Sequence, residues 1–326
     1  MALAVKQETF ASLGPQWDAL FQRSSVQKVF LTPQWQQLCW DFREPGASLH
    51  LLTVRDGDGL LAIAPLKLVG ETLTFLGDPN TTDYGDFLVC KDAPLEQVYH
   101  CLFEAVNALG WRTLDLWGLQ EVSPTLARMK EMTRAAGWSV SVRQEEVVPY
   151  LELPDSWEGY LEGMDKKQRH ELRRKIRRLS EAGQVMFSHV SDAAGLETAL
   201  EVLMGLMAAS REDKASFLNE RHTAFFRALA PVMFSAGYLK LFFLMLDGRR
   251  VAGVLCFDSG GQYQLYNSGY DPAYAPLSVG LLSKVFCLQD AISSGRRVFD
   301  FMRGGEVYKY RLGAKNASVN RLEVTR

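Results

Sequence analysis

A polar segment near the end of the chain holds the side-chain types that a group-transfer reaction needs. The segment follows a predicted strand and contains Arg303, Glu306, Tyr308 and Lys309. Strand ends beside loops are places where sites gather. A lysine ammonium can stabilise the negative charge of a tetrahedral intermediate, and a glutamate or tyrosine can accept a proton. The segment therefore holds candidates for an oxyanion donor, Lys309, and for a proton acceptor, Glu306 or Tyr308.

The same residues have a structural interpretation, and the rest of the sequence limits the chemistry. Asp300 and Arg303 can form an ion pair while the tyrosine side chains only pack.

No Ser-His-Asp or Cys-His arrangement stands out, so direct transfer is favoured over a covalent enzyme intermediate. The five histidines lack metal-site spacing, so we expect no metal. The five cysteines form no CxxC pair and lie in apolar surroundings, which predicts buried free thiols in a reducing compartment.

The elements that must position this segment form one unit. Residues 251–257 and 262–266 are predicted strands, followed by a loop with two prolines. Apolar residues then recur at helical spacing from Leu277 to Ile292, and Gly295 stands where a helix C-cap belongs. A third strand covers 298–302. The predicted helix begins beside a sheet, where its free backbone N–H groups can bind an anion.

A weak internal repeat indicates that this unit has a relative in the first half. The segment Gly110–Leu116 resembles Gly295–Phe301 at an offset of 185 residues. In each half a predicted helix precedes the segment, and two strand-like runs precede the helix. The shared order of elements favours duplication over coincidence.

Charge is distributed unevenly along the chain. Residues 1–150 carry 12 Lys and Arg against 18 Asp and Glu, and residues 151–326 carry 24 against 20. Eight of the basic residues fall between Lys166 and Arg178 on a predicted amphipathic helix. Arg169, Arg173 and Arg177 recur at every fourth position, and such a row can bind phosphate. A phosphate-bearing donor or acceptor, a solvated basic face, and a membrane or nucleic-acid surface all remain open for this helix.

Several segments of the second half resemble the GNAT acyltransferase superfamily, and more narrowly its FemAB and CelD-like branch. The resemblance covers most of residues 150–326 and is looser in the first half. The segments that carry it are Tyr270–Tyr274, Leu277–Gly280, Phe299–Gly304 and Tyr308–Gly313.

The resemblance implies an α/β fold of two tandem GNAT-like domains, each a mixed, mainly antiparallel sheet flanked by helices. Residues 1–150 would be the N-terminal domain on the acceptor side, degenerate for donor binding, and residues 151–326 the domain on the acyl-donor side. The donor would be bound by Tyr270, Leu277, Ser278, Val279 and Gly280. The usual donor loop of the superfamily is Gln/Arg-x-x-Gly-x-Gly/Ala, of which this chain keeps only Gly280.

The resemblance also suggests an acceptor side in the acidic loop at 77–86. There Asp83 is a candidate for assisting catalysis, with Glu306 and Tyr308 as the other candidate proton acceptors. Tyr84 and Asp86, together with Arg169, Arg173, Arg177 and Arg303, are candidates for acceptor or phosphate binding. The alternative is that the aspartates and glycines of the loop only make a surface turn.

These observations predict a cytoplasmic N-acyltransferase, with possible contact with the inner membrane surface. The leading hypothesis is transfer from acyl-coenzyme A, acetyl-coenzyme A included, to an amine on an envelope-related sugar, lipid or amino-acid precursor. A second is FemX-like transfer from aminoacyl-tRNA to a peptidoglycan precursor. A third is a non-catalytic binder of membrane or nucleic acid. Neither a secretion signal nor an apolar run of membrane-spanning length is expected, and no cofactor is expected to be permanently bound.

Overall fold

The computed structural model describes residues 3–326, which divide into two compact units. Unit 1 comprises residues 3–147 with Ala317–Arg326, and unit 2 comprises Val148–Asn316. The boundary after Val147 lies close to the predicted one. The last ten residues, however, belong to unit 1, although the sequence analysis assigned them to the second domain. They contain a strand whose partners lie far back in the chain, so no local pattern indicated where it pairs.

Unit 1 is built on one mixed sheet. Its strands are β1 (Ala4–Glu8), β2 (Ser48–Asp56), β3 (Gly59–Val69), β4 (Thr72–Phe75), β5 (Leu88–Val89), β6 (Thr113–Gln120), β7 (Ser139–Val147) and β14 (Ser318–Thr325). The order is β1-β2-β3-β4-β6-β14-β7, with β5 beside β3. Only β4 and β6 run parallel; the other pairs, including those of β14 with β6 and β7, are antiparallel.

Helices surround the sheet of unit 1. They are α1 (Phe10–Leu13), α2 (Pro15–Arg23), α3 (Pro33–Asp41), α4 (Leu95–Asn107) and α5 (Pro124–Ala135), with a 3-10 turn, η1, at Val29–Leu31. Side chains of α4 and α5, such as Leu102 and Met129, form a core with Leu52 and Val54 of β2. Successive strand residues point to opposite faces of a sheet. Thr53 and Arg55 therefore point away from this core.

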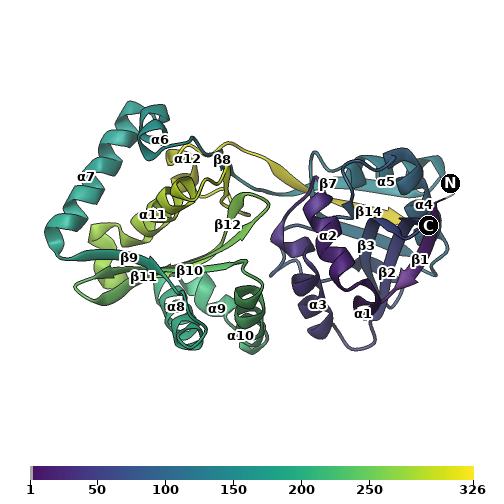
Figure 1. The fold of residues 1–326 in the computed structure, drawn as a ribbon, viewed down its shortest axis with the longest axis horizontal. Helices are drawn as coiled ribbons and strands as arrows, with labels where there is room; N and C mark the ends of the chain where they lie inside the picture. Colours follow the sequence, from purple (N-terminus) through teal and green to yellow (C-terminus); the bar gives the residue numbers. More distant parts are fainter. Residues whose placement is uncertain (1–2) are drawn as a thin grey trace. The chain divides into compact units, whose positions relative to one another are not determined.

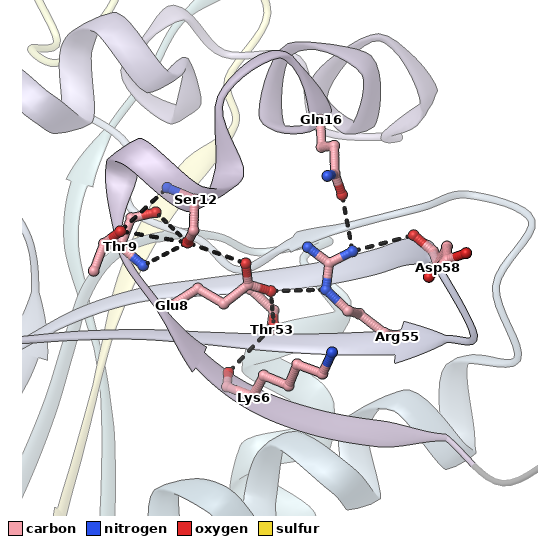
Figure 2. A network of polar contacts seen from close by, with 8 residues as sticks. All are labelled: Lys6, Glu8, Thr9, Ser12, Gln16, Thr53, Arg55 and Asp58. Carbon is pink, nitrogen blue, oxygen red and sulfur yellow. Dashed lines mark hydrogen bonds and ion pairs between the residues drawn. The ribbon is translucent and has the colours of Figure 1, made fainter.

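A polar network on that opposite face ties the N-terminal segment to the sheet (Figure 2). Arg55 Nε lies 2.7 Å from Glu8 Oε1, and Arg55 Nη1 donates to Gln16 of α2 at 2.8 Å. The hydroxyl of Thr53 also donates to Glu8, at 2.9 Å. Burial raises the pKa of Glu8, but its bonds to Arg55 and the neighbouring hydroxyls outweigh burial and lower it. The network is satisfied from within and therefore serves the fold.

Unit 2 is built on a second mixed sheet, in the order β8-β13-β12-β11-β10-β9. The strands are β8 (Tyr150–Glu152), β9 (Val185–His189), β10 (Leu239–Leu246), β11 (Arg249–Ser259), β12 (Gln262–Tyr270) and β13 (Val298–Asp300). Only β12 and β13 run parallel. β8 forms one edge of the sheet and β9 the other.

Helices cover both faces of the second sheet (Figure 1). They are α6 (Trp157–Gly163), α7 (Lys166–Ala182), α8 (Leu196–Ser210), α9 (Glu212–Phe217), α10 (Glu220–Ser235), α11 (Val279–Ser293) and α12 (Val307–Arg311), with a 3-10 turn, η2, at Pro272–Leu277. Figure 1 shows α8, α9 and α10 on one side of the sheet and α11 on the other. None of the helices within residues 3–326 combines the length and apolarity needed to cross a membrane.

Side-chain caps begin three of the helices in unit 2. Ser156 accepts a hydrogen bond from Gly159 N–H at 3.1 Å and begins α6. Asp165 accepts from the N–H groups of Lys167 and Gln168 and begins α7. Asn219 caps α10 through His222 N–H at 2.9 Å.

The sequence repeat is visible in the geometry of the two sheets. In unit 1 the parallel pair joins Thr72–Thr74 to Thr113–Asp115, and in unit 2 it joins Gln262–Gln264 to Val298–Asp300. Thr113 and Val298 hold the same place in the repeated segment, 185 positions apart. The predicted similarity of the two halves is thus seen as the same parallel pairing at equivalent residues.

Candidate active site

The centre of the candidate site is the place where β12 and β13 separate. The two strands pair only over Gln262–Gln264 and Val298–Asp300. β12 then continues to Tyr270, whereas the chain leaves β13 after Asp300. Beyond this point the edge of β12 that faces β13 has no strand partner. Such an edge offers backbone N–H and C=O groups to a bound molecule.

The start of α11 lies next to this opening in the chain, directly after β12 and η2. Ser278, the cap residue, has φ 58°, and no side chain caps the helix. Leu281 and Leu282 donate to Ser278 O, and no hydrogen bond is found among the described residues for the N–H groups of Val279 and Gly280. Lys175 of α7 donates to Ser278 Oγ at 3.0 Å. A helix start with open N–H groups and a lysine beside it favours an anion.

Gly280 has a steric reason to be glycine that the sequence did not reveal. A Cβ at this position would lie 2.7 Å from Cδ1 of the Tyr270 ring. The missing side chain therefore makes room for Tyr270 at the start of the helix. Tyr270, Leu277, Ser278, Val279 and Gly280 thus lie at one place, and their role in donor binding stays a prediction.

A tight turn after β13 carries the polar segment with which the sequence analysis began. Met302 adopts φ 61° and Gly304 adopts φ 106°; the first is an uncommon conformation for a side chain of this size. Lys309 Nζ donates to the carbonyl oxygens of Met302, Arg303 and Gly304 at 3.1, 2.8 and 2.8 Å. The buried ammonium therefore holds the turn.

Lys309 also pairs with Glu306. Its Nζ lies 2.9 Å from Glu306 Oε2, and the side chain is 2% exposed, against 43% for Glu306. Burial raises the pKa of Glu306, but the hydrogen bond and charge of Lys309 lower it by more, so the carboxylate is ionised at neutral pH. The donors of Lys309 are already shared among four acceptors. To act on an oxyanion, Lys309 would have to release one of them, so its predicted oxyanion role stays a prediction.

Tyr308 and two further lysines lie around this carboxylate. Burial raises the pKa of Tyr308, so its hydroxyl keeps its proton. Lys284 of α11 lies over the Tyr308 ring, 5.3 Å from its centre, and donates to Gly280 O at 2.7 Å. Lys214 of α9 donates to Ser268 O of β12. The charges of Lys214, Lys284 and Glu306 all act on one another.

Lys214 and Lys284 are the residues that the sequence analysis missed. Burial lowers the pKa of Lys284 to about 7 and that of Lys214 to about 8. The charge of Lys214 lowers the pKa of Lys284 further, and the charge of Arg211 lowers that of Lys214. Neither forms an ion pair with a carboxylate in residues 3–326. The only available signal was a lysine inside the apolar stretch around Leu282 and Val285, which is unusual for a buried helix face.

The predicted arginine row of α7 is not uniform. Arg169 donates to the carbonyls of Leu161 and Glu162 at 3.2 and 3.3 Å and so closes the end of α6. Arg177 lies 3.7 Å from Glu181, whereas Arg173 is exposed. Lys175, on the neighbouring face, is the basic residue that reaches the start of α11.

The predicted acceptor residues of the first half lie in unit 1. Asp83 is partly exposed, but Tyr84 and Asp86 are 2% and 3% exposed. Lys28 Nζ lies 4.6 Å from the centre of the Tyr84 ring, and Asp86 accepts a hydrogen bond from Phe87 N–H at 2.8 Å. The loop is therefore not the exposed surface turn that the alternative described, at least at these two positions. Their predicted roles stay predictions.

Comparison with known proteins agrees with this geometry. Residues 166–310 match a family model described as an acetyltransferase (GNAT) domain. The structure resembles a crystal structure of FemX, with a TM-score of 0.68, 12% identity, and coverage of 98% of this chain and 96% of that one. It also resembles a tandem GNAT protein from the clavulanic acid biosynthesis pathway, with a TM-score of 0.52, 13% identity and 98% coverage of both chains.

A third similar structure is a C-terminal domain assigned to a lysylphosphatidylglycerol synthetase from Agrobacterium fabrum. The TM-score is 0.59 and the identity 12%, with coverage of 98% of this chain and 92% of that one. No curated protein matches the sequence. At these identities the structural matches establish the fold.

Residues 166–310 thus match a GNAT acetyltransferase domain, and the likeness to FemX and to the tandem GNAT protein shows that the chain shares their fold. The predicted fold class, tandem α/β with two mixed sheets flanked by helices, is confirmed, and so is the prediction of an enzyme that transfers an acyl group to an amine.

Proposed function

We propose that the protein transfers an acyl group from an acyl-coenzyme A to a primary amine, and that unit 2 binds the donor. The observation that carries the proposal is the separation of β12 from β13 beside the open start of α11. The thioester would lie along the unpaired edge of β12. The phosphates of the coenzyme A would contact the N–H groups of Val279 and Gly280 and the ammonium of Lys175. That ammonium lies 3.0 Å from Ser278 Oγ.

The cluster of charged residues supplies groups for the chemical step. The amine nitrogen attacks the thioester carbonyl, a C–N bond forms, the C–S bond breaks, and the amine loses a proton while the thiolate gains one. Glu306 is our candidate for the proton acceptor because it is ionised and partly exposed. Lys284 is our candidate for stabilising the developing negative charge. Tyr308, which keeps its proton, suits the thiolate better than it suits the amine.

Lys309 would then act by positioning. Its ammonium fixes the turn at Met302–Gly304 and the side chain of Glu306 at once. Asp83 remains a candidate proton acceptor on the acceptor side, and unit 1 would supply that side, as the resemblance implies. Buried Cys39, Cys256 and Cys287, all free thiols, support a reducing, cytoplasmic location.

A FemX-like donor is the second candidate. The likeness to FemX over nearly the whole chain favours it, and so does the exposed basic surface of α7, which would suit the phosphates of an aminoacyl-tRNA. The likeness to a lysylphosphatidylglycerol synthetase domain supports a lipid or other envelope-related acceptor for either donor, with contact at the inner membrane surface through the same helix.

Thermal unfolding with each donor distinguishes these candidates. Acetyl-coenzyme A should raise the melting temperature of the wild type by mass action. Lys175→Glu should abolish the rise, while Lys167→Glu, an exposed change on the same helix, should leave it intact. A rise with aminoacyl-tRNA alone, weakened equally by both variants, would replace coenzyme A by tRNA as the donor. Mass spectrometry of an amine panel incubated with acetyl-coenzyme A then identifies the acceptor.

A further inference from the structure

Unit 1 contains a cavity of about 220 Å³ that plays no part in the proposed transfer site. It opens between the starts of α4 and α5, beside the segment that follows α2. Its walls are mostly apolar, and the lining residues used below are Val26, Asp86, Phe87, Leu95 and Pro124. Pockets for drug-sized ligands measure roughly 300–1,000 Å³, so this cavity is too small for a nucleotide and suits a small molecule.

One wall of the cavity contains an unusual carboxyl group. Asp86 is 3% exposed, and its Oδ1 accepts the N–H of Phe87 at 2.8 Å. Its Oδ2 is buried and makes no hydrogen bond of ordinary geometry in the described structure, although the hydroxyls of Thr125 and Ser123 lie close enough to the carboxyl group to lower its pKa. Buried polar atoms nearly always have a partner. A buried carboxylate oxygen that lines a cavity and lacks one is therefore a position for a donor from a ligand.

The charge of the Asp86 carboxyl group suits a positively charged donor. Burial raises the pKa of Asp86 to about 6, against the opposing effect of the hydroxyls of Thr125 and Ser123 and of Phe87 N–H. At neutral pH the group is therefore mostly ionised, at a cost in solvation that a bound cation would offset. The sequence analysis named Asp86 as a candidate for acceptor or phosphate binding, and of these a buried carboxylate suits a cationic acceptor better than an anion.

Two helices, α4 and α5, begin at the cavity, and a helix start favours an anion over a cation. Leu95 begins α4, which has no side-chain cap, and helix starts favour anions. Glu96 already places a carboxylate in the first turn of α4, where it pairs with Arg128. Ser123 caps α5. The start of α5 is therefore capped, and the first turn of α4 already contains a carboxylate, so neither helix start needs a bound anion.

We propose that this cavity binds a small primary amine with an apolar body, with the ammonium on Asp86 Oδ2 and the apolar part against Val26, Phe87 and Pro124. The ammonium supplies the missing donor and the compensating charge. The apolar walls supply burial for the rest of the ligand. The site lies wholly within unit 1, so amine binding there can be tested independently of donor binding in unit 2.

The test uses 3-methylbutylamine as the probe and 4-methylpentanoate as its control of opposite charge. Both are titrated into the whole protein without acyl donor, and the amide resonance of Phe87 is followed by NMR. We expect saturable binding of the amine and none of the carboxylate. Asp86→Asn, which keeps the acceptor for Phe87 N–H, should weaken amine binding at least tenfold, and Glu96→Gln should leave it unchanged.

Two further measurements keep the test decisive if Asp86→Asn folds poorly. Amine binding should strengthen about tenfold from pH 5 to pH 7, because Asp86 loses its proton near pH 6 while the amine stays charged. Val26→Phe should block the cavity and abolish binding without touching Asp86. Binding of the carboxylate, a flat pH profile, or no saturable binding of the amine to the wild type would overturn the proposal and leave a bound water as the partner of Oδ2.

Discussion

Two cations in each unit are held differently. In unit 1, Arg55 pairs with Glu8 at 2.7 Å and Lys67 with Glu44 at 2.8 Å, so each of these two buried charges has a carboxylate. In unit 2, half-buried Lys214 and buried Lys284 donate to the carbonyl oxygens of Ser268 and Gly280 and pair with no carboxylate in the described structure, unlike Lys309 of the same unit. A buried cation with a carboxylate is compensated within the fold. A buried cation without one is unfavourable until an anion arrives, which is why we place the reaction in unit 2.

The two units also differ at their equivalent parallel strand pairs, β4 with β6 and β12 with β13. Where β4 and β6 separate in unit 1, the rings of Phe75, Phe87 and Trp117 fill the space, with centres 5.8 and 5.9 Å from that of Phe75. Gly85 N–H also bonds to Gly118 O of β6. Beyond the paired part of β12 in unit 2, Lys214 instead donates to Ser268 O, and its charge interacts with those of Lys284 and Glu306. The packed opening in unit 1 supports our proposal that this unit does not bind the donor.

The largest expected effect comes from removing the proposed proton acceptor. Glu306→Gln should lower kcat by about 10²–10⁴-fold, as for loss of a general base, with a small change in the KM for acetyl-coenzyme A. Release of the coenzyme A thiol in the presence of the acceptor amine measures this. Asp83→Asn is the matched control for the other candidate; a large loss in that variant and none in Glu306→Gln would move the base to Asp83.

Lys284 should show opposite effects on activity and stability. Lys284→Met should lower kcat by about 10²-fold, the effect of losing one oxyanion donor. The pKa of Lys284 is lowered in the folded state, so the unfolded state binds more protons between about pH 7 and the ordinary lysine value. Stability of the wild type should therefore rise with pH across that range, and Lys284→Met should raise the melting temperature at pH 7.

The matched control for Lys284 lies in unit 1. Lys67→Met removes the partner of Glu44 and of Gly77 O, and should lower the melting temperature without changing kcat. If the two lysine variants behaved alike, in either direction, the distinction between paired and unpaired cations would carry no functional meaning.

Asp86 should limit the stability of unit 1 at neutral pH. Its folded pKa, about 6, lies above the usual value of 3.8, so the folded state binds more protons between these values and stability falls as pH rises through them. Asp86→Asn should therefore stabilise the protein at pH 7.5 by roughly 1–3 kcal/mol and have little effect at pH 3.5. Denaturant unfolding at the two pH values measures the difference, and an equal change at both would contradict the pKa assignment.

The smallest effect is expected on the exposed face of α7. Arg173→Glu should change the free energy of unfolding by less than about 0.5 kcal/mol and leave the KM for acetyl-coenzyme A unchanged. Arg169→Glu should cost more stability, because Arg169 holds the end of α6. Weaker sedimentation of Arg173→Glu with anionic vesicles would support membrane contact, and unchanged sedimentation would exclude this position from it.

The sequence predicted that the two repeated segments are related, but it did not predict the pairing of the last strand. Thr113 and Val298 could be related because the same local pattern surrounds each. The partners of β14 could not be predicted, because β6 and β7 lie about two hundred residues earlier in the chain and pairing across that distance leaves no local periodicity.

The candidate site was predicted in part for the same physical reason. Glu306, Tyr308 and Lys309 follow a strand end, which is a local signal. Lys214 lies among other charged residues in Arg211–Lys214, and nothing there indicates that it turns inward to Ser268 O. Whether a lysine is buried beside a second lysine depends on tertiary packing, which single-sequence patterns do not report.

The most direct test of the account is a crystal structure of the wild-type protein with a non-hydrolysable acyl-coenzyme A analogue. We predict that the thioester replacement lies along β12 where it leaves β13, with the phosphates at Val279, Gly280 and Lys175. Analogue bound where β4 leaves β6 in unit 1, or bound in unit 2 away from the start of α11, would contradict the central claim that the unpaired lysines of unit 2 mark the site of transfer.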